Sequence, residues 1–147
     1  MNKRVALGIL LLVALIWFPL AIASSEEVVE EVYLLVRERE LLAFSAVEDR
    51  WVTQDLRPNE RVLDSKYSGR VAVVFTKFRV LGFSALTNRW DEEKLMVDEA
   101  MVTIEAQGNV GTAITNLRAL GFSAKTGKWI VKRFGPKCER MVSGLGI

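Results

Sequence analysis

The chain has 147 residues, with 20 Lys or Arg, 18 Asp or Glu, one cysteine and no histidine. The lack of histidine excludes His-based catalytic triads and nearly all zinc or copper sites. The single cysteine, Cys138, excludes an internal disulfide, and without a histidine partner it cannot support a cysteine-protease mechanism.

Residues 1–23 have the pattern of a secretory signal peptide. Lys3 and Arg4 precede a long apolar stretch, and small residues follow at 21–23, where a signal peptidase cleaves. The stretch approaches the roughly 20 residues of a membrane span, so an uncleaved anchor is the alternative and would be the only membrane contact. We therefore predict an exported protein, periplasmic or extracellular, whose mature part, 24–147, is a single domain.

A short motif recurs three times at a fixed spacing. Phe-Ser-Ala, followed shortly afterwards by Trp, begins at Phe44, Phe83 and Phe122. The constant period of about 39 residues indicates one structural unit used three times. Alignment on these phenylalanines defines three modules, 32–70, 71–109 and 110–147, and residues that this alignment superposes are called equivalent.

The residue pattern of each module predicts about four short antiparallel strands. The first is a β-branched apolar run, at 32–36, 71–75 and 110–114. The second contains the Phe-Ser-Ala motif, at 40–46, 80–85 and 119–124. The third starts at the tryptophan and ends at 56, 95 or 134, and the fourth covers 61–67 and 101–106. Asn88 and Gly127 share one aligned position before the tryptophan, and both residue types accept positive φ, which predicts a tight turn there.

The recurring aromatic residues are predicted to form the core that holds one repeat to the next. A sugar-stacking role for the three tryptophans is the alternative. The predicted core residues are Phe44, Trp51, Phe83, Trp90, Phe122 and Trp129.

The stretch from Ala119 to Trp129, which contains Thr126-Gly127 just before the tryptophan, resembles the blade motif of β-propellers of the PQQ-dehydrogenase-like and kelch types. Thr87-Asn88 before Trp90 matches in the same way. The resemblance implies that the tryptophans pack between neighbouring blades. It implies no quinone cofactor, and no cofactor of any kind is expected.

The predicted fold is therefore all-β, with three repeated four-stranded antiparallel modules arranged as propeller-like blades around a pseudo-threefold axis. Propellers have four to eight blades, whereas this chain has three modules. Two chains could pool their modules into a six-bladed ring as a homodimer, or three modules could close alone, as in a β-trefoil.

Charge is distributed unevenly between the two ends of the chain. The third module has seven basic residues and one acid, whereas four glutamates follow the predicted signal peptide at 26–31. Opposite charges would help the first and last modules meet, within one ring or between two chains, and two solvated charge runs are the alternative. Without its signal segment the chain is formally neutral, so no nucleic-acid partner is expected.

The leading functional expectation is a secreted or periplasmic, non-enzymatic binding or scaffold protein whose partner is an unknown protein or glycan. Its binding loops would include Arg79 and Arg118, which occupy equivalent positions. A lectin-like protein that binds carbohydrate through the tryptophans is the second hypothesis. The third is a glycan hydrolase that uses Asp91, Glu93 or Asp98, and Asp91 with Glu93 could also bind Ca²⁺ weakly.

Overall fold

The computed structural model describes residues 27–135, so the predicted signal peptide and Cys138 lie outside the described residues. Within this range the chain forms eleven strands and no helix, and hence no helix that could cross a membrane. The strands are β1 (Val32–Val36), β2 (Glu40–Ser45), β3 (Arg50–Asp55), β4 (Val62–Ser68), β5 (Val71–Thr76), β6 (Arg79–Ser84), β7 (Arg89–Lys94), β8 (Met101–Gln107), β9 (Val110–Thr115), β10 (Arg118–Ser123) and β11 (Lys128–Arg133).

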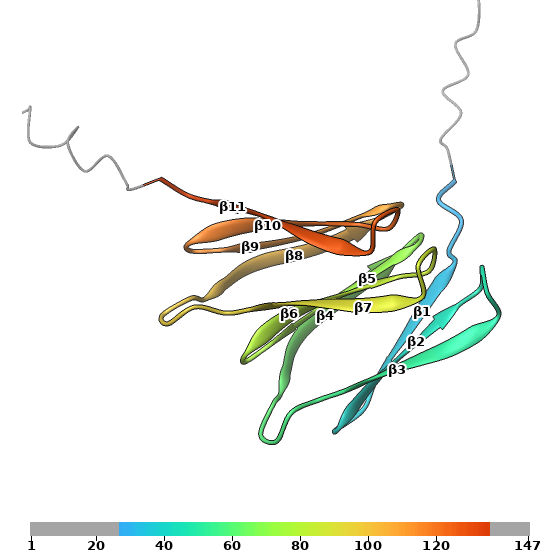
Figure 1. Cartoon of the computed structure of the whole chain (residues 1–147), viewed down its shortest axis with the longest axis horizontal. Helices are drawn as coiled ribbons and strands as arrows, with labels where there is room; N and C mark the ends of the chain where they lie inside the picture. Colours follow the sequence, from blue (N-terminus) through green and yellow to red (C-terminus); the bar gives the residue numbers. More distant parts are fainter. Residues whose placement is uncertain (1–26, 136–147) are drawn as a thin grey trace, which may run out of the picture.

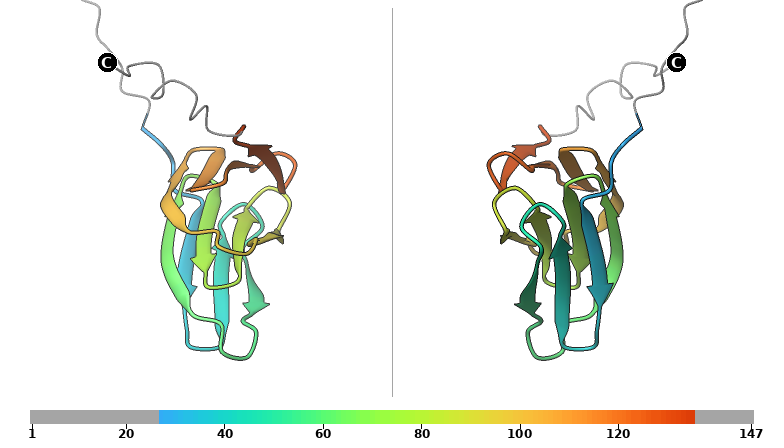
Figure 2. Two further views of the ribbon diagram at one scale, coloured as in Figure 1. Left: turned by 90° about the vertical axis from the view of Figure 1, so that its left-hand side faces the viewer. Right: turned by 90° about the vertical axis from the view of Figure 1, so that its right-hand side faces the viewer.

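The strands form three separate antiparallel sheets that are stacked in chain order. The first sheet is β1-β2-β3, the second is β4-β5-β6-β7 and the third is β8-β9-β10-β11. Figure 1 and Figure 2 show the second sheet lying between the other two. The all-β prediction with repeated antiparallel modules is confirmed, and the described strands form no closed barrel of the kind that a trefoil requires.

The expected pseudo-threefold axis is not formed by the described residues. A threefold ring would bring the first and third sheets together, whereas the second sheet separates them (Figure 1). Propellers close with four to eight blades, so three sheets packed in this way are fewer than such a ring requires. One face of the first sheet and one face of the third sheet are therefore uncovered by any of the residues 27–135.

The sheets are offset from the sequence modules. The strand predicted at 61–67 as the end of the first module is β4, and it pairs with β5 at the edge of the second sheet. Because the β4–β5 hairpin is tight, β4 pairs with the strand that follows it rather than with the strands before it. The first sheet consequently has three strands within the described residues, and the edge of β1 that faces away from β2 is unpaired.

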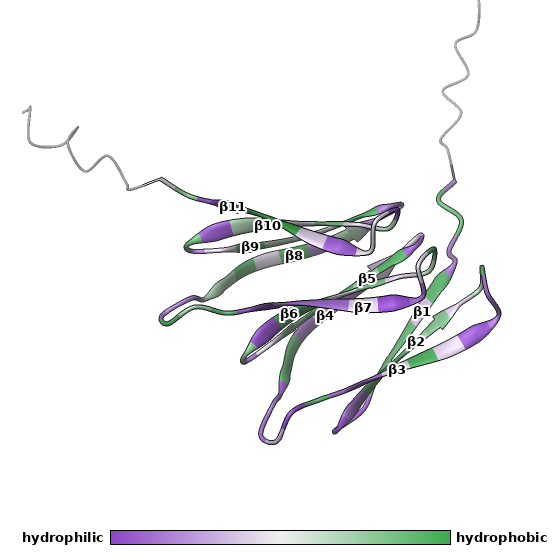
Figure 3. Cartoon of the chain, viewed as in Figure 1, coloured by the Kyte–Doolittle hydropathy of each residue, from purple (hydrophilic) through white to green (hydrophobic). Residues whose placement is uncertain are grey.

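Two apolar cores lie between the sheets, and the second sheet contributes to both. All residues of β5 and β6 are buried, because alternate side chains point to the first and third sheets. In Figure 3 the hydrophobic β1 contrasts with the hydrophilic β7, which carries Asp91, Glu92 and Glu93. The core between the first and second sheets includes Val32, Leu34, Leu41, Ala43, Leu81 and Phe83. The core between the second and third sheets includes Val73, Phe75, Ile104, Leu120, Phe122 and Trp129.

The turn predicted before each tryptophan is present in all three sheets. Asn88 and Gly127 have φ angles of 51° and 63°, and Asp49 has a φ of 50° at the equivalent place in the first sheet. These left-handed conformations are tolerated by Gly, Asn and Asp, which is why these residue types recur there.

Candidate functional site

The three Phe–Trp pairs have the same internal geometry. The ring centroids of Phe44 and Trp51 are 5.2 Å apart, those of Phe83 and Trp90 are also 5.2 Å apart, and those of Phe122 and Trp129 are 5.1 Å apart. The interplanar angles are 53°, 48° and 51°. Each pair is a cross-strand contact, because the Phe in the second strand of the repeat lies opposite the Trp in the third.

The surroundings of the three pairs differ. Phe83 and Phe122 are buried, and Trp129 is only 6% exposed, so the predicted core role is correct there. Trp90 is half-buried and packs against the same core as Phe83. Trp51, in contrast, is 51% exposed, and Phe44 is only half-buried. The expectation of three equivalent core pairs is wrong for the first sheet, because no described sheet precedes it.

The phenylalanine of each covered pair packs against the preceding sheet, which carries a small residue, Ala43 or Gly82, at the equivalent position. A Cβ atom added at Gly82 would lie 2.6 Å from the Phe122 ring, so only glycine fits beneath that ring. Ala43, the equivalent of Gly82 in the first sheet, lies in the core that contains Phe83. Gly121, the equivalent residue of the third sheet, has no atom within 4 Å of an added Cβ, because it lies on the uncovered face of that sheet.

The two covered tryptophans also bond to the preceding sheet. Trp90 Nε1 donates to the Val52 carbonyl and Trp129 Nε1 donates to the Asp91 carbonyl, each at 3.3 Å. The two acceptors occupy equivalent positions, so the same bond is repeated at successive interfaces. Among the described residues, no such acceptor is found for Trp51.

Arg79 lies in a buried polar cluster between the first and second sheets. It is 3% exposed, and its Nε and Nη2 donate to the two carboxylate oxygens of Glu60 at 2.8 and 2.9 Å. Nη2 also donates to the Asp55 carbonyl, and Nη1 pairs with Glu92. Glu60 accepts a further bond of 2.7 Å from the Thr76 hydroxyl.

The same cluster recurs one repeat later, between the second and third sheets. Arg118 Nε donates to Glu99 at 2.7 Å, and Thr115 donates to the same carboxylate at 2.8 Å. Arg118 Nη2 bonds to the Lys94 carbonyl, and Nη1 lies 3.4 Å from Glu93 of the second sheet. The expectation that Arg79 and Arg118 belong to binding loops is therefore wrong, because both guanidinium groups are buried and fully engaged by acids and carbonyls.

In the first sheet the equivalent positions carry a reversed pair. Arg37 occupies the place of Thr76 and Thr115, and Glu40 occupies the place of Arg79 and Arg118. Arg37 Nη1 donates to Glu40 at 2.9 Å in an exposed pair. This difference leaves a carboxylate on the uncovered face of the first sheet.

The two cluster glutamates have lowered pKa values. Burial alone raises the pKa of Glu60, but hydrogen bonds from Arg79, the Arg57 amide and Thr76 outweigh it and hold the pKa below its usual value. Glu99 behaves in the same way, with Arg118, the Met96 amide and Thr115 as donors. Both carboxylates are therefore ionised in the folded state at neutral pH.

We expect these clusters to make the fold acid-sensitive. A carboxylate whose pKa is lowered by folding stabilises the native state above its unfolded pKa of about 4.3, and this contribution is lost as the pH falls through the lower native pKa. The urea midpoint should therefore fall as the pH decreases from about 5 towards 3. A Glu99→Gln variant should show a weaker dependence over this range, and an identical dependence would contradict the assignment.

The carboxylates considered for catalysis or Ca²⁺ binding have structural partners. Asp91 Oδ2 accepts a 2.9 Å bond from the Trp129 amide, and Glu93 pairs with Arg118. Asp98 has a φ of 61° in the turn between β7 and β8, and the equivalent Asn59 has the same φ. The structure does not bring the three carboxylates together, and the described residues contain no metal-binding group of three acidic, histidine or cysteine side chains.

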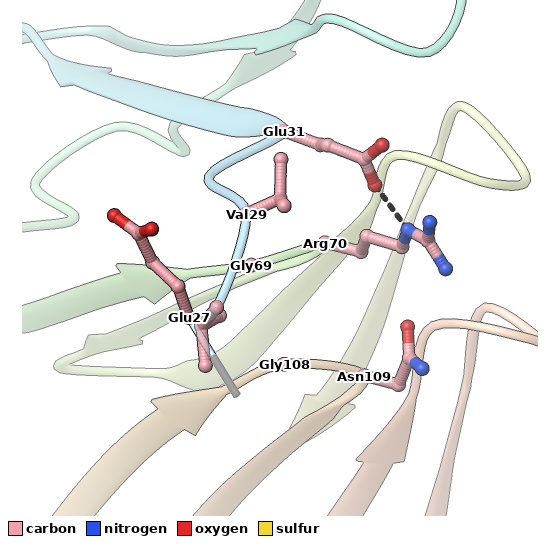
Figure 4. Close-up of a pocket in the computed structure, with 8 residues that line it drawn as sticks. Glu27, Val29, Glu31, Gly69, Arg70, Gly108 and Asn109 are labelled. Atoms are coloured by element: carbon pink, nitrogen blue, oxygen red, sulfur yellow. Dashed lines mark hydrogen bonds and ion pairs between the residues drawn. The ribbon is translucent and has the colours of Figure 1, made fainter. Parts of the chain in front are cut away.

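A pocket of about 330 Å³ lies where the N-terminal segment crosses the β4–β5 and β8–β9 hairpins. Figure 4 shows Glu31, Arg70 and Asn109, each one repeat after the last, on successive elements around it. Arg70 Nε pairs with Glu31, while the Arg70 amide donates to the Gly108 carbonyl at 2.8 Å. These contacts join the β4–β5 hairpin to the start of the first sheet and to the β8–β9 hairpin.

Neither a protein-family model nor a curated protein matches this chain. Sequence reasoning missed Glu60 and Glu99 as the partners of the buried arginines. The signal was present, because the Glu, Thr and Arg of each cluster all recur with the same spacing as the Phe–Trp motif.

Proposed function

We propose that this chain is an exported, non-enzymatic scaffold built of β-propeller-type blades, and that it binds a protein through the uncovered face of its first sheet. We call this surface the open face of the first sheet. It consists of Tyr33, Leu35, Glu40, Leu42, Phe44 and Trp51.

One observation carries this proposal: the open face has the same Phe–Trp pair that is covered in the other two sheets. Tyr33, Leu35 and Trp51 are all exposed on it. A contiguous exposed apolar surface with aromatic residues at its centre is typical of a protein-binding site. Trp and Tyr are also the residues that most often dominate the binding energy of such sites.

The edge of β1 that has no partner strand among residues 27–135 adjoins this face. An exposed strand edge presents free amide and carbonyl groups to which another chain can add a strand. The face and the edge together offer a partner both side-chain and main-chain contacts.

The blade assignment is supported by the strand arrangement. The first strands of the second and third sheets, β4 and β8, contact each other at one edge of the stack, and the chain passes from the last strand of one sheet to the first strand of the next. Successive blades of a propeller are connected in this way. A non-catalytic role is supported by the structural bonds of Asp91 and Glu93.

Affinity purification from exporting cells after crosslinking tests the binding surface. The Trp51→Ser variant should lose the partners that the wild-type protein retains, because the centre of the open face is removed. Val97→Ser is the matched control, since Val97 is 87% exposed in the turn between β7 and β8, away from that face. Retention of every partner by Trp51→Ser would contradict the proposal.

A lectin-like function is favoured by one observation. Trp51 lies edge-on to Tyr33 at 6.4 Å, and Tyr33 lies edge-on to Tyr67 at 5.6 Å, so three exposed aromatic rings form a cluster that a sugar could stack on. Trp90 and Trp129 are packed between sheets, so such a site would use Trp51 alone of the three.

Tryptophan fluorescence separates the two functions. In the processed protein without a bound partner, we expect Trp51 to give the most solvent-exposed emission, so that Trp51→Phe shifts the spectrum to shorter wavelength and reduces iodide quenching. Glycans should leave the wild-type emission unchanged. A glycan that shifts the emission of the wild type, but not that of Trp51→Phe, would favour the lectin.

A further inference from the structure

We propose that the occupant of the open face of the first sheet is a second copy of this chain, seated through the uncovered face of its third sheet. This inference rests on the proposed binding role of the first face. The uncovered face of the third sheet, here called the open face of the third sheet, is lined by Val110, Thr112, Ile114, Ala119, Gly121, Ile130 and Lys132.

The two sheet–sheet interfaces within the chain indicate how two copies would pack on each other. The third sheet packs on the second as the second packs on the first, and the buried phenylalanine, the tryptophan Nε1–carbonyl bond and the serine–carbonyl bond are repeated by equivalent residues. A third interface of the same kind would place the first sheet of one copy on the third sheet of another. Phe44 of one copy would then lie over Gly121 of the second copy, as Phe122 lies over Gly82. Gly121 has the required open space, and Phe44 lacks a covering sheet.

The hydrogen-bond donors and acceptors on the two open faces occupy the positions that form bonds at the two interfaces within the chain. Trp51 Nε1 would donate to the Ile130 carbonyl of the second copy, since Val52, Asp91 and Ile130 are equivalent and the first two accept the corresponding bonds. Ser45 donates to the Ala85 carbonyl at 3.0 Å, and Ser84 donates to the Ala124 carbonyl. Ser123 is the next serine in this series, and its acceptor would be the Ala46 carbonyl of the second copy.

Charge complementarity supports the same pairing. Between the second and third sheets, Arg118 meets Glu93. At the proposed interface the equivalent residues are Glu40 on the first sheet and Lys132 on the third, so both charges are reversed and attraction is retained. Lys132 alternates along β11 with Trp129 and Val131, which pack on the second sheet, and so it lies on the open face.

Two copies would close the assembly. Each copy would offer its first sheet to one side and its third sheet to the other, so that two identical contacts form a ring of six sheets with twofold symmetry. Six lies within the range of blade numbers at which such rings close.

Sedimentation velocity of the processed, full-length protein at micromolar concentration tests this inference. The wild type should have the mass of two chains. Gly121→Trp should raise the dissociation constant about a hundredfold, because it fills the space for Phe44. The structure leaves room for this side chain within one copy, so circular dichroism and the urea midpoint extrapolated to dilute protein should be unchanged.

A charge exchange provides the matched control. Lys132→Glu should weaken the dimer about tenfold, and the double variant Glu40→Lys/Lys132→Glu should restore it. A wild-type mass of one chain, a ladder of larger masses, or a dimer unaffected by Gly121→Trp would overturn the inference. If the wild type is monomeric but Trp51→Ser still loses a different protein partner, the inference fails while the proposed function stands.

Discussion

Replacement of Phe122 with alanine is expected to lower the free energy of unfolding by about 3–5 kcal/mol. The Phe122 ring is buried at the centre of the core between the second and third sheets, directly over Gly82. The glycine has no side chain that could move into the space left by the ring, so a cavity remains. Urea unfolding followed by far-ultraviolet circular dichroism measures the change.

Phe78→Ala is the matched control for this substitution. Phe78 lies in the turn between β5 and β6 and is exposed, so the same change in volume there should cost about 0.5 kcal/mol or less. Equal losses in the two variants would show that the third sheet does not depend on the ring of Phe122 for its packing.

Replacement of Glu99 with alanine is the second change for which we expect a large effect, about 3–5 kcal/mol of destabilisation. The Glu99 side chain is fully buried and accepts bonds from Arg118 and Thr115. Its removal leaves the buried Arg118 guanidinium with only Glu93, at 3.4 Å, and the Lys94 carbonyl. The loss arises mainly from the uncompensated buried charge rather than from the strength of the pair itself.

The reversed pair in the first sheet supplies a control within the same chain. Arg37→Ala breaks the ion pair with Glu40 at the equivalent repeat positions, but Arg37 is largely exposed. The expected loss is about 0–1 kcal/mol. Thermal and urea unfolding of the two variants side by side measures the difference, and a Glu99→Ala protein as stable as Arg37→Ala would contradict the role given to the buried clusters.

The strands and their faces could be predicted from the sequence because they depend on local patterns. The apolar run at Val32–Val36 is β1, and the alternation of Leu81 and Phe83 with Gly82 places these residues on opposite faces of β6 as expected. Asn88 and Gly127 predicted the turn because these two residue types accept the left-handed conformation that it requires.

The sheet boundaries could not be predicted in the same way. The strand pattern of β4 is equally compatible with pairing to the strand before it or to the strand after it, and only the three-dimensional path of the chain selects β5. The unequal burial of Trp51 and Trp129 has a similar origin. Their sequence contexts are almost alike, but the exposure of each tryptophan depends on whether another sheet lies in front of it.

The burial of Arg79 and Arg118 could not be predicted from their residue type. Arginine is mostly exposed, and a turn between two strands is an ordinary place for it. Burial becomes favourable only when acids from another part of the chain satisfy the guanidinium, and Glu60 lies 19 residues from Arg79. The spacing of Glu60 and Glu99 carries this information, which emerges when the repeat is compared position by position rather than through its aromatic residues alone.

The second and third sheets each pack their repeated phenylalanine against the sheet before them, and Phe122 lies directly over Gly82. Nuclear Overhauser contacts between the Hα protons of Gly82 and the ring protons of Phe122 test this claim most directly. We predict strong contacts, together with an upfield shift of the Gly82 Hα protons caused by the ring above them. If the Phe122 ring shows contacts only within its own sheet, and the Gly82 protons have ordinary shifts, the stacked arrangement is wrong.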